Sequence, residues 1–148
     1  MTLNQIIQKI QTQVESHKMV GKFAVGAEYN LAVDEVKFYP LVWLVPDGFD
    51  LATGENNRYV NYRFALLVFD RVFESESNTI EVLSDTAQII IDIMALIDYN
   101  YNNNSDFQLV VSSTAEPFYD AKTDIVAGYG IQFQISTPYL ADACVVPV

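Results

Sequence analysis

The residues that commonly carry out enzyme chemistry are scarce in this chain of 148 residues. His17 is the single histidine and Cys144 the single cysteine. We expect His17, at the end of an expected helix, to be a surface or capping residue. Cys144 stands in an apolar stretch with no cation nearby in sequence to stabilise a thiolate, so we expect a packed, unreactive thiol. No Gly-x-Ser-x-Gly motif provides a nucleophile. We therefore expect no catalytic residue and no enzyme activity.

Ligand-binding patterns are equally weak. Asp47, Asp50 and Glu55 lie close together in sequence, but they lack the alternating carboxylates and central glycine of a calcium-binding loop. One histidine and one cysteine cannot complete a zinc site. The glycines form no phosphate-binding motif, and Gly128 and Gly130 indicate a bulge or a close backbone approach within a strand. We expect no metal and no cofactor.

The charge balance restricts the possible partners. The formal net charge is −11, so phosphate backbones and anionic membrane surfaces would repel the chain. The start of the chain lacks a signal-peptide pattern, and the apolar run 89–97 is too short to span a bilayer. With a single cysteine, a reducing compartment is expected. We expect synthesis and assembly in the cytoplasm and no membrane association.

Hydrophobic periodicity predicts two main helices. The first covers residues 2 to about 18, and the second runs from a capping-box-like start at Asn78 and Glu81 to about Tyr99. Residues 23–36 fit either a loop or a short irregular strand. Strands are expected at 38–45, 59–72, 107–112 and 125–137. A turn at 46–48 followed by a polar loop to about residue 58, an asparagine-rich loop at 99–104 and an acidic connection at 116–124 join them.

The predicted architecture is a single α+β domain covering residues 1–148. The element order is helix, two strands, helix, two strands. The simplest arrangement is one antiparallel sheet of about four strands with the two main helices packed against it.

The second expected helix has more apolar surface than one sheet can bury. At 100° per residue, its apolar arc covers well over half of the circumference. Another element or a neighbouring subunit must cover the remainder. The apolar C-terminal tail either pairs within its own sheet or adds to the sheet edge of a neighbour. The subunit-interface candidates are therefore Ile89, Ile93, Leu96, Tyr99, Tyr101, Leu140, Val145, Val146 and Val148.

Three segments resemble small phage neck and tail-completion proteins, which include tail terminators and head–tail connector rings. They are YPLVWLVPDGF (39–49), YRFALLVFDRV with EVLSDTAQIIIDIMALI (62–72 and 81–97), and DIVAGYGIQFQISTPYLADACVVP (124–147). The resemblance implies a structural virion protein without a cofactor. It would form a ring with copies of itself and contact adjacent neck, portal-side or tail rings. Such rings have six or twelve members, and the sequence does not choose between them.

In such a ring, DNA would pass through the channel as cargo without being bound. An acidic wall repels phosphates, so DNA moves past without adhering. The acidic loop or lumen candidates are Asp47, Asp50, Glu55, Glu116, Asp120 and Asp124, and plain surface charge is the alternative for each one.

Two further functions remain open. An acidic inhibitor or immunity-type protein that masks a basic partner would have the same charge and the same lack of catalytic groups. A small-molecule-binding domain would use the nine tyrosines and Trp43 to line a closed pocket.

Overall fold

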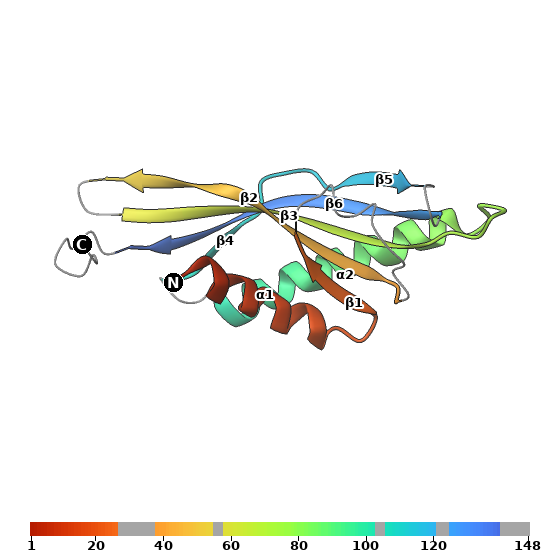
Figure 1. Cartoon of the computed structure of the whole chain (residues 1–148), viewed down its shortest axis with the longest axis horizontal. Helices are drawn as coiled ribbons and strands as arrows, with labels where there is room; N and C mark the ends of the chain where they lie inside the picture. Colours follow the sequence, from red (N-terminus) through yellow and green to blue (C-terminus); the bar gives the residue numbers. More distant parts are fainter. Residues whose placement is uncertain (27–37, 55–57, 103–105, 121–124, 140–148) are drawn as a thin grey trace.

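A computed structural model describes residues 1–26, 38–54, 58–102, 106–120 and 125–139. The two helices are α1 (Leu3–Ser16) and α2 (Thr79–Tyr101). The strands are β1 (Lys22–Val25), β2 (Leu41–Thr53), β3 (Arg58–Arg71), β4 (Gln108–Val110), β5 (Glu116–Asp120) and β6 (Val126–Pro138). Both helices lie on one side of the sheet (Figure 1). The α+β class and the two helices agree with the sequence-based prediction.

The predicted sheet is wrong in both strand number and direction. The sheet has six strands in the order β1-β2-β3-β6-β4, and β5 also pairs with β6. β1 runs parallel to β2, so the sheet is mixed, while β2–β3 and β3–β6 are long antiparallel pairs. The two additional strands, β1 and β5, account for the difference.

Both additional strands are short and depend on tertiary contacts. β1 overlaps the segment that fitted either a loop or a short strand, and β5 was predicted as a connection. β1 has four residues, too few to give a clear period. It reaches β2 because the Gly21 amide donates a hydrogen bond to the Pro40 carbonyl at 2.8 Å. β5 begins at Glu116 and ends at Asp120, so its acidic ends resemble a connection. Its central Phe118 instead packs edge-on against Phe69, with ring centroids 5.5 Å apart.

The main core lies between the two helices and the sheet. Ile6, Ile10 and Val14 of α1 are completely buried, as the 3–4 spacing predicts. They meet alternate residues of β3, beginning with Phe64, which stacks on Phe133 of β6 at 5.4 Å. Thr2 and Gln5 start α1 with a reciprocal capping box.

The start of α2 differs from its prediction. Asn78 occupies the N-cap position, but its side chain makes no capping hydrogen bond to the helix. Its Oδ1 atom accepts a hydrogen bond from the Phe73 amide at 2.7 Å instead. Asn78 therefore holds the turn between β3 and α2.

A smaller cluster covers part of the opposite sheet face. Leu41, Phe69 and Val126 are buried there, and Trp43 and Phe118 pack against them. The Trp43 indole donates to the Gly26 carbonyl at 3.1 Å. This cluster joins β1, β2, β3, β5 and β6 without any helix.

Candidate functional site

His17 has a structural position in the described part of the chain. It is the C-cap residue of α1, and its side chain is mostly buried against α2. Nδ1 accepts a hydrogen bond from the Met19 amide at 3.2 Å, while Nε2 lies 3.0 Å from the Asp92 Oδ2 atom. The tautomer with the proton on Nε2 satisfies both contacts. His17 thus caps one helix and ties it to the other.

Within the described ranges, no three His, Cys, Asp or Glu residues come together as metal ligands would. Asp47 and Asp50 both belong to β2 rather than to a loop. Glu55 and Cys144 lie outside the described residues, so the structure places neither the calcium candidate's third acid nor the thiol.

The most prominent surface feature is a projecting hairpin. We define the arm as residues 49–53 of β2 and 58–62 of β3. The arm extends past the start of α1 at one end of the molecule (Figure 1). The predicted turn at 46–48 and the polar loop after it are wrong, whereas the β3 side of the arm lies within the predicted strand 59–72. Both strands continue, and their register shifts between Pro46 and Phe49. Gly48, with φ +90°, accommodates that irregularity.

One face of the arm is apolar and uncovered. Phe49 pairs with Tyr62, Leu51 with Val60, and Thr53 with Arg58. Directly paired residues share a sheet face, and this face continues the one that packs on the helices. Beyond α1 no helix covers it, so Phe49 is 60% exposed and Leu51 55% exposed.

The other face of the arm is polar and internally hydrogen-bonded. Asn61 donates to Asp50 at 2.9 Å and accepts from Ser136 at 2.7 Å, while Gln134 donates to Ser136 at 3.2 Å. This chain of contacts crosses β2, β3 and β6. It therefore stiffens the base of the arm and satisfies the polar groups of that face.

The exposed edge of the arm discourages strand addition. β1 pairs only with the first four residues of β2, Leu41–Leu44. Past that point the edge carries the irregularity at Gly48 and the exposed carboxylates of Asp47 and Asp50. Irregularities and edge charges are the features by which sheet proteins avoid edge-to-edge association. The apolar face of the arm, rather than its edge, is thus the available contact surface.

The interface candidates on α2 do not form one surface. Ile89 and Ile93 are completely buried in the chain's own core, so their side chains are not available to a neighbour. Leu96 is half-buried, and Tyr99 is 78% exposed. The sheet and α1 together cover the apolar stripe of α2, which was expected to be larger than one sheet can bury. Leu140, Val145, Val146 and Val148 lie outside the described residues.

Tyr101 is tied into the contact between the helices. Its hydroxyl accepts a hydrogen bond from Gln13 at 2.8 Å, and Asn100 donates to the same Gln13 side chain at 2.7 Å. The Lys9 amine lies 4.4 Å from the centre of its ring, and Phe107 packs against it. Tyr101 therefore serves the fold, since these contacts engage both its hydroxyl and its ring.

A second exposed apolar group lies at the opposite end of the molecule from the arm (Figure 1). We define the entry turn as residues 73–81, which lead from β3 into α2. Phe73 is 63% exposed and Ile80 is 79% exposed. The carboxylates of this segment, all exposed, belong to Glu74, Glu76 and Glu81. The entry turn thus combines apolar surface with negative charge.

The acidic lumen candidates do not converge. Asp50 pairs with Asn61, which faces Ser136 on β6, whereas Glu116 faces Gly130. Six residues along one strand correspond to roughly 20 Å. Asp47 is exposed near Gly48, and Asp120 ends β5. Glu55 and Asp124 lie outside the described residues. The placed acids are therefore dispersed along the sheet.

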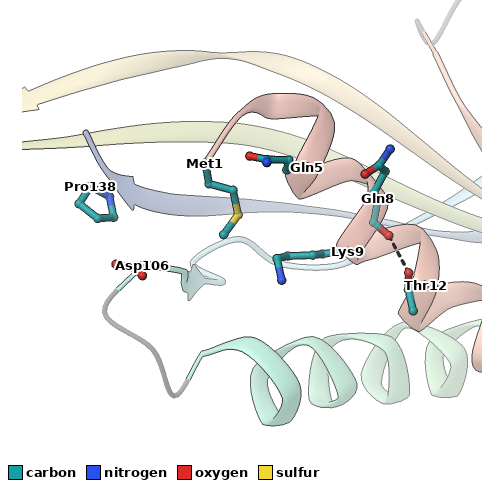
Figure 2. A pocket seen from close by; sticks show the side chains of 7 residues that line it. All are labelled: Met1, Gln5, Gln8, Lys9, Thr12, Asp106 and Pro138. Atoms are coloured by element: carbon teal, nitrogen blue, oxygen red, sulfur yellow. Dashed lines mark hydrogen bonds between the residues drawn. The ribbon is translucent and has the colours of Figure 1, made fainter. Parts of the chain in front are cut away.

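An open groove of about 560 Å³ lies beside α1. Figure 2 shows Met1 and Lys9 on one side, with Asp106 and Pro138 across from them. The Thr12 hydroxyl donates to the Gln8 carbonyl at 2.9 Å, so it is engaged by the helix. The lining residues include no aromatic side chain. This groove therefore differs from the aromatic pocket that the small-molecule hypothesis requires.

Sequence reasoning missed the apolar groups that the structure exposes. Phe49 and Leu51 stand two residues apart, a strand-like spacing that the preceding Pro-Asp-Gly signal obscured. Phe73 and Ile80 are apolar residues isolated among acids. Two apolar residues close together among acids were the available signal, because an exposed apolar patch rimmed by polar residues marks an interaction site.

No helix within the described residues has the length and apolar composition needed to cross a membrane. The chain matches no protein-family model and no curated protein at a significant level.

Proposed function

We propose that this chain is a structural subunit of a phage virion that forms a ring in the neck or tail, as a tail terminator or head–tail connector does. The ring would assemble by protein–protein contacts around a DNA channel, with six or twelve copies. DNA would be passing cargo. Adjacent portal-side or tail rings would be the other partners.

The arm is the observation that carries this proposal. A hairpin that projects past the helices with Phe49 and Leu51 more than half exposed gains little for the fold of one chain. Burial of such side chains against a neighbour removes apolar surface from water, at about 25 cal/mol per Å². The exposed entry turn at the other end supplies a second surface. Two distinct contact surfaces on one subunit are what a closed ring needs.

The net charge of −11 is consistent with a ring around DNA, and it also favours the competing inhibitor function. An inhibitor that masks a basic protein presents its acids as one surface. Here the acids are divided among separate places: Asp50 and Glu116 lie on distant parts of the sheet, and Glu74, Glu76 and Glu81 lie on the entry turn. The ring therefore remains the better-supported function.

The mass of the purified protein in solution tests the proposal. Light scattering over a wide concentration range should show a defined multiple of 16.7 kDa, and electron microscopy should show closed rings of that stoichiometry. A chain that stays monomeric at every concentration and also fails to join isolated necks or tails would overturn the proposal. A compact 1:1 complex with a basic protein would support the inhibitor function instead.

A further inference from the structure

We infer that the arm of one copy docks on the entry turn of the next copy, so that the subunits join head to tail. This inference rests on the proposed ring function and names the two surfaces that meet. The occupant of each surface is a second copy of this chain.

The two surfaces match in apolar character. The arm presents Phe49 and Leu51, and the entry turn presents Phe73 and Ile80. All four side chains are more than half exposed in the single chain. An aromatic side chain on each surface is typical of the positions that dominate binding energy at protein interfaces.

The two surfaces are also complementary in charge. Arg58 pairs with Thr53 at the far end of the arm, on the same face as Leu51 and Val60. The guanidinium is exposed, and no carboxylate among the described residues forms an ion pair with it. The entry turn carries exposed Glu74, Glu76 and Glu81. When the arm of one copy meets the entry turn of the next, Arg58 therefore lies near the carboxylates of the entry turn. This favours arm-to-entry-turn contact over contact between two arms or between two entry turns.

The placement of the surfaces allows each copy to contact two different neighbours. The arm and the entry turn lie at opposite ends of the long axis (Figure 1). Each copy would thus use one surface toward one neighbour and the other surface toward the next. Such a heterologous contact produces a ring when the rotation closes.

Two variants should each lose assembly while keeping the fold. The arm variant carries Phe49→Ser, Leu51→Ser and Arg58→Glu. The entry-turn variant carries Phe73→Ser, Ile80→Ser and Glu81→Lys. Each should raise the concentration needed for assembly at least about tenfold, because each loses an apolar pair and acquires a like-charge contact. Ile91→Gln is the matched control, because Ile91 is 60% exposed on α2 and lies outside both surfaces. This variant should assemble at the wild-type concentration.

Mixing the two variants provides the decisive measurement. The arm variant retains a normal entry turn, and the entry-turn variant retains a normal arm. Equal amounts should therefore form a 1:1 dimer that grows no further, since both surfaces left free at its ends have lost their exposed apolar side chains. Light scattering measures this mass directly, and circular dichroism verifies the fold of each variant.

The alternative outcomes separate the two proposals. Rings formed by either variant at the wild-type concentration would overturn the head-to-tail contact and leave the ring function intact. Equal loss of assembly in Ile91→Gln would also overturn it, because the effect would not depend on the two surfaces. A wild-type chain that never associates would overturn both proposals.

Discussion

The Nε2 atom of His17 lies 3.0 Å from the Oδ2 atom of Asp92, and this contact joins the end of α1 to the middle of α2. His17 is 11% exposed and Asp92 41% exposed. The hydrogen bond from His17 lowers the pKa of Asp92 below its usual 3.8, and a second bond from Gln88 adds to the effect.

The His17–Asp92 contact should make a small contribution to the free energy of unfolding, and this contribution should depend on pH. The folded-state pKa of Asp92 is lowered, so its contribution is present above pH 3.8 and is lost as pH falls through the folded pKa. Replacing Asp92 by Ala should cost less than about 1 kcal/mol at pH 7, because the carboxylate is substantially solvated. Urea unfolding of His17→Ala, Asp92→Ala and the double variant measures the coupling. A double-mutant cycle that gives zero coupling energy between His17 and Asp92 at pH 7 would contradict this contact.

Asp70 should have the opposite effect on stability, because its ionised carboxyl should destabilise the fold at neutral pH. Burial is the largest influence on its carboxyl and raises the pKa, with the charge of Asp85 adding to it, although the Arg71 amide bonds Oδ1 and lowers it. An acid with a raised folded-state pKa contributes stability below pH 3.8 that is lost as pH rises through the folded pKa. Asp70→Asn keeps the acceptor for the Arg71 amide. It should therefore raise the melting temperature at pH 7 and have little effect below pH 3. A lower melting temperature at pH 7 would refute this.

Gly128 and Gly130 should differ strongly in their tolerance of a methyl group. A Cβ atom at Gly128 would overlap the Val68 carbonyl oxygen, whereas one at Gly130 would meet only the end of the Leu67 side chain closely, at 2.7 Å. Backbone in a sheet cannot move aside, but a side chain can change its rotamer. Gly128→Ala should cost about 3 kcal/mol or more, and Gly130→Ala clearly less. Denaturant unfolding of both variants measures the difference, and equal costs would contradict the close approach.

Replacing Phe64 should reduce the stability of the fold, whereas replacing Phe49 should leave that stability almost unchanged. Phe64 is 1% exposed and stacked on Phe133, so Phe64→Ala should cost about 3–5 kcal/mol. Phe49→Ala, on the exposed arm face, should change unfolding free energy by only about 0.5 kcal/mol. Chemical unfolding of each variant tests this. A large loss at Phe49 would mean that the arm supports the fold itself.

The sequence predicted the elements whose hydrophobic pattern repeats over many residues. α1 and β6 have clear 3–4 and alternating patterns, and both were predicted close to their observed ranges. The prediction of a bulge or a close backbone approach is confirmed as a close approach at Gly128, whereas Gly130 faces the Leu67 side chain. β1 was left open between a loop and a short strand, and β5 was missed, because pairing with β2 and β6, not their own pattern, makes them strands.

The candidate contact surface was less predictable. Ile89 and Ile93 are strongly apolar, but periodicity alone cannot tell whether a helix of the same chain or a neighbour covers them. The packing of α1 decides this, and it buries both. Pro46, Asp47 and Gly48 indicated a turn, yet the same residues allow an irregularity within a strand that continues.

β6 is paired along its length with β3 on one side and with β4 and β5 on the other. It is also the last strand of the described chain to leave the ribosome. Until it emerges, β3 has an open inner edge, and the apolar residues of α1 and α2 lack the β6 part of their binding surface. Nascent chains stopped before residue 126 should therefore aggregate or recruit chaperones, and the protein should reach its native form only after most of it has been synthesised.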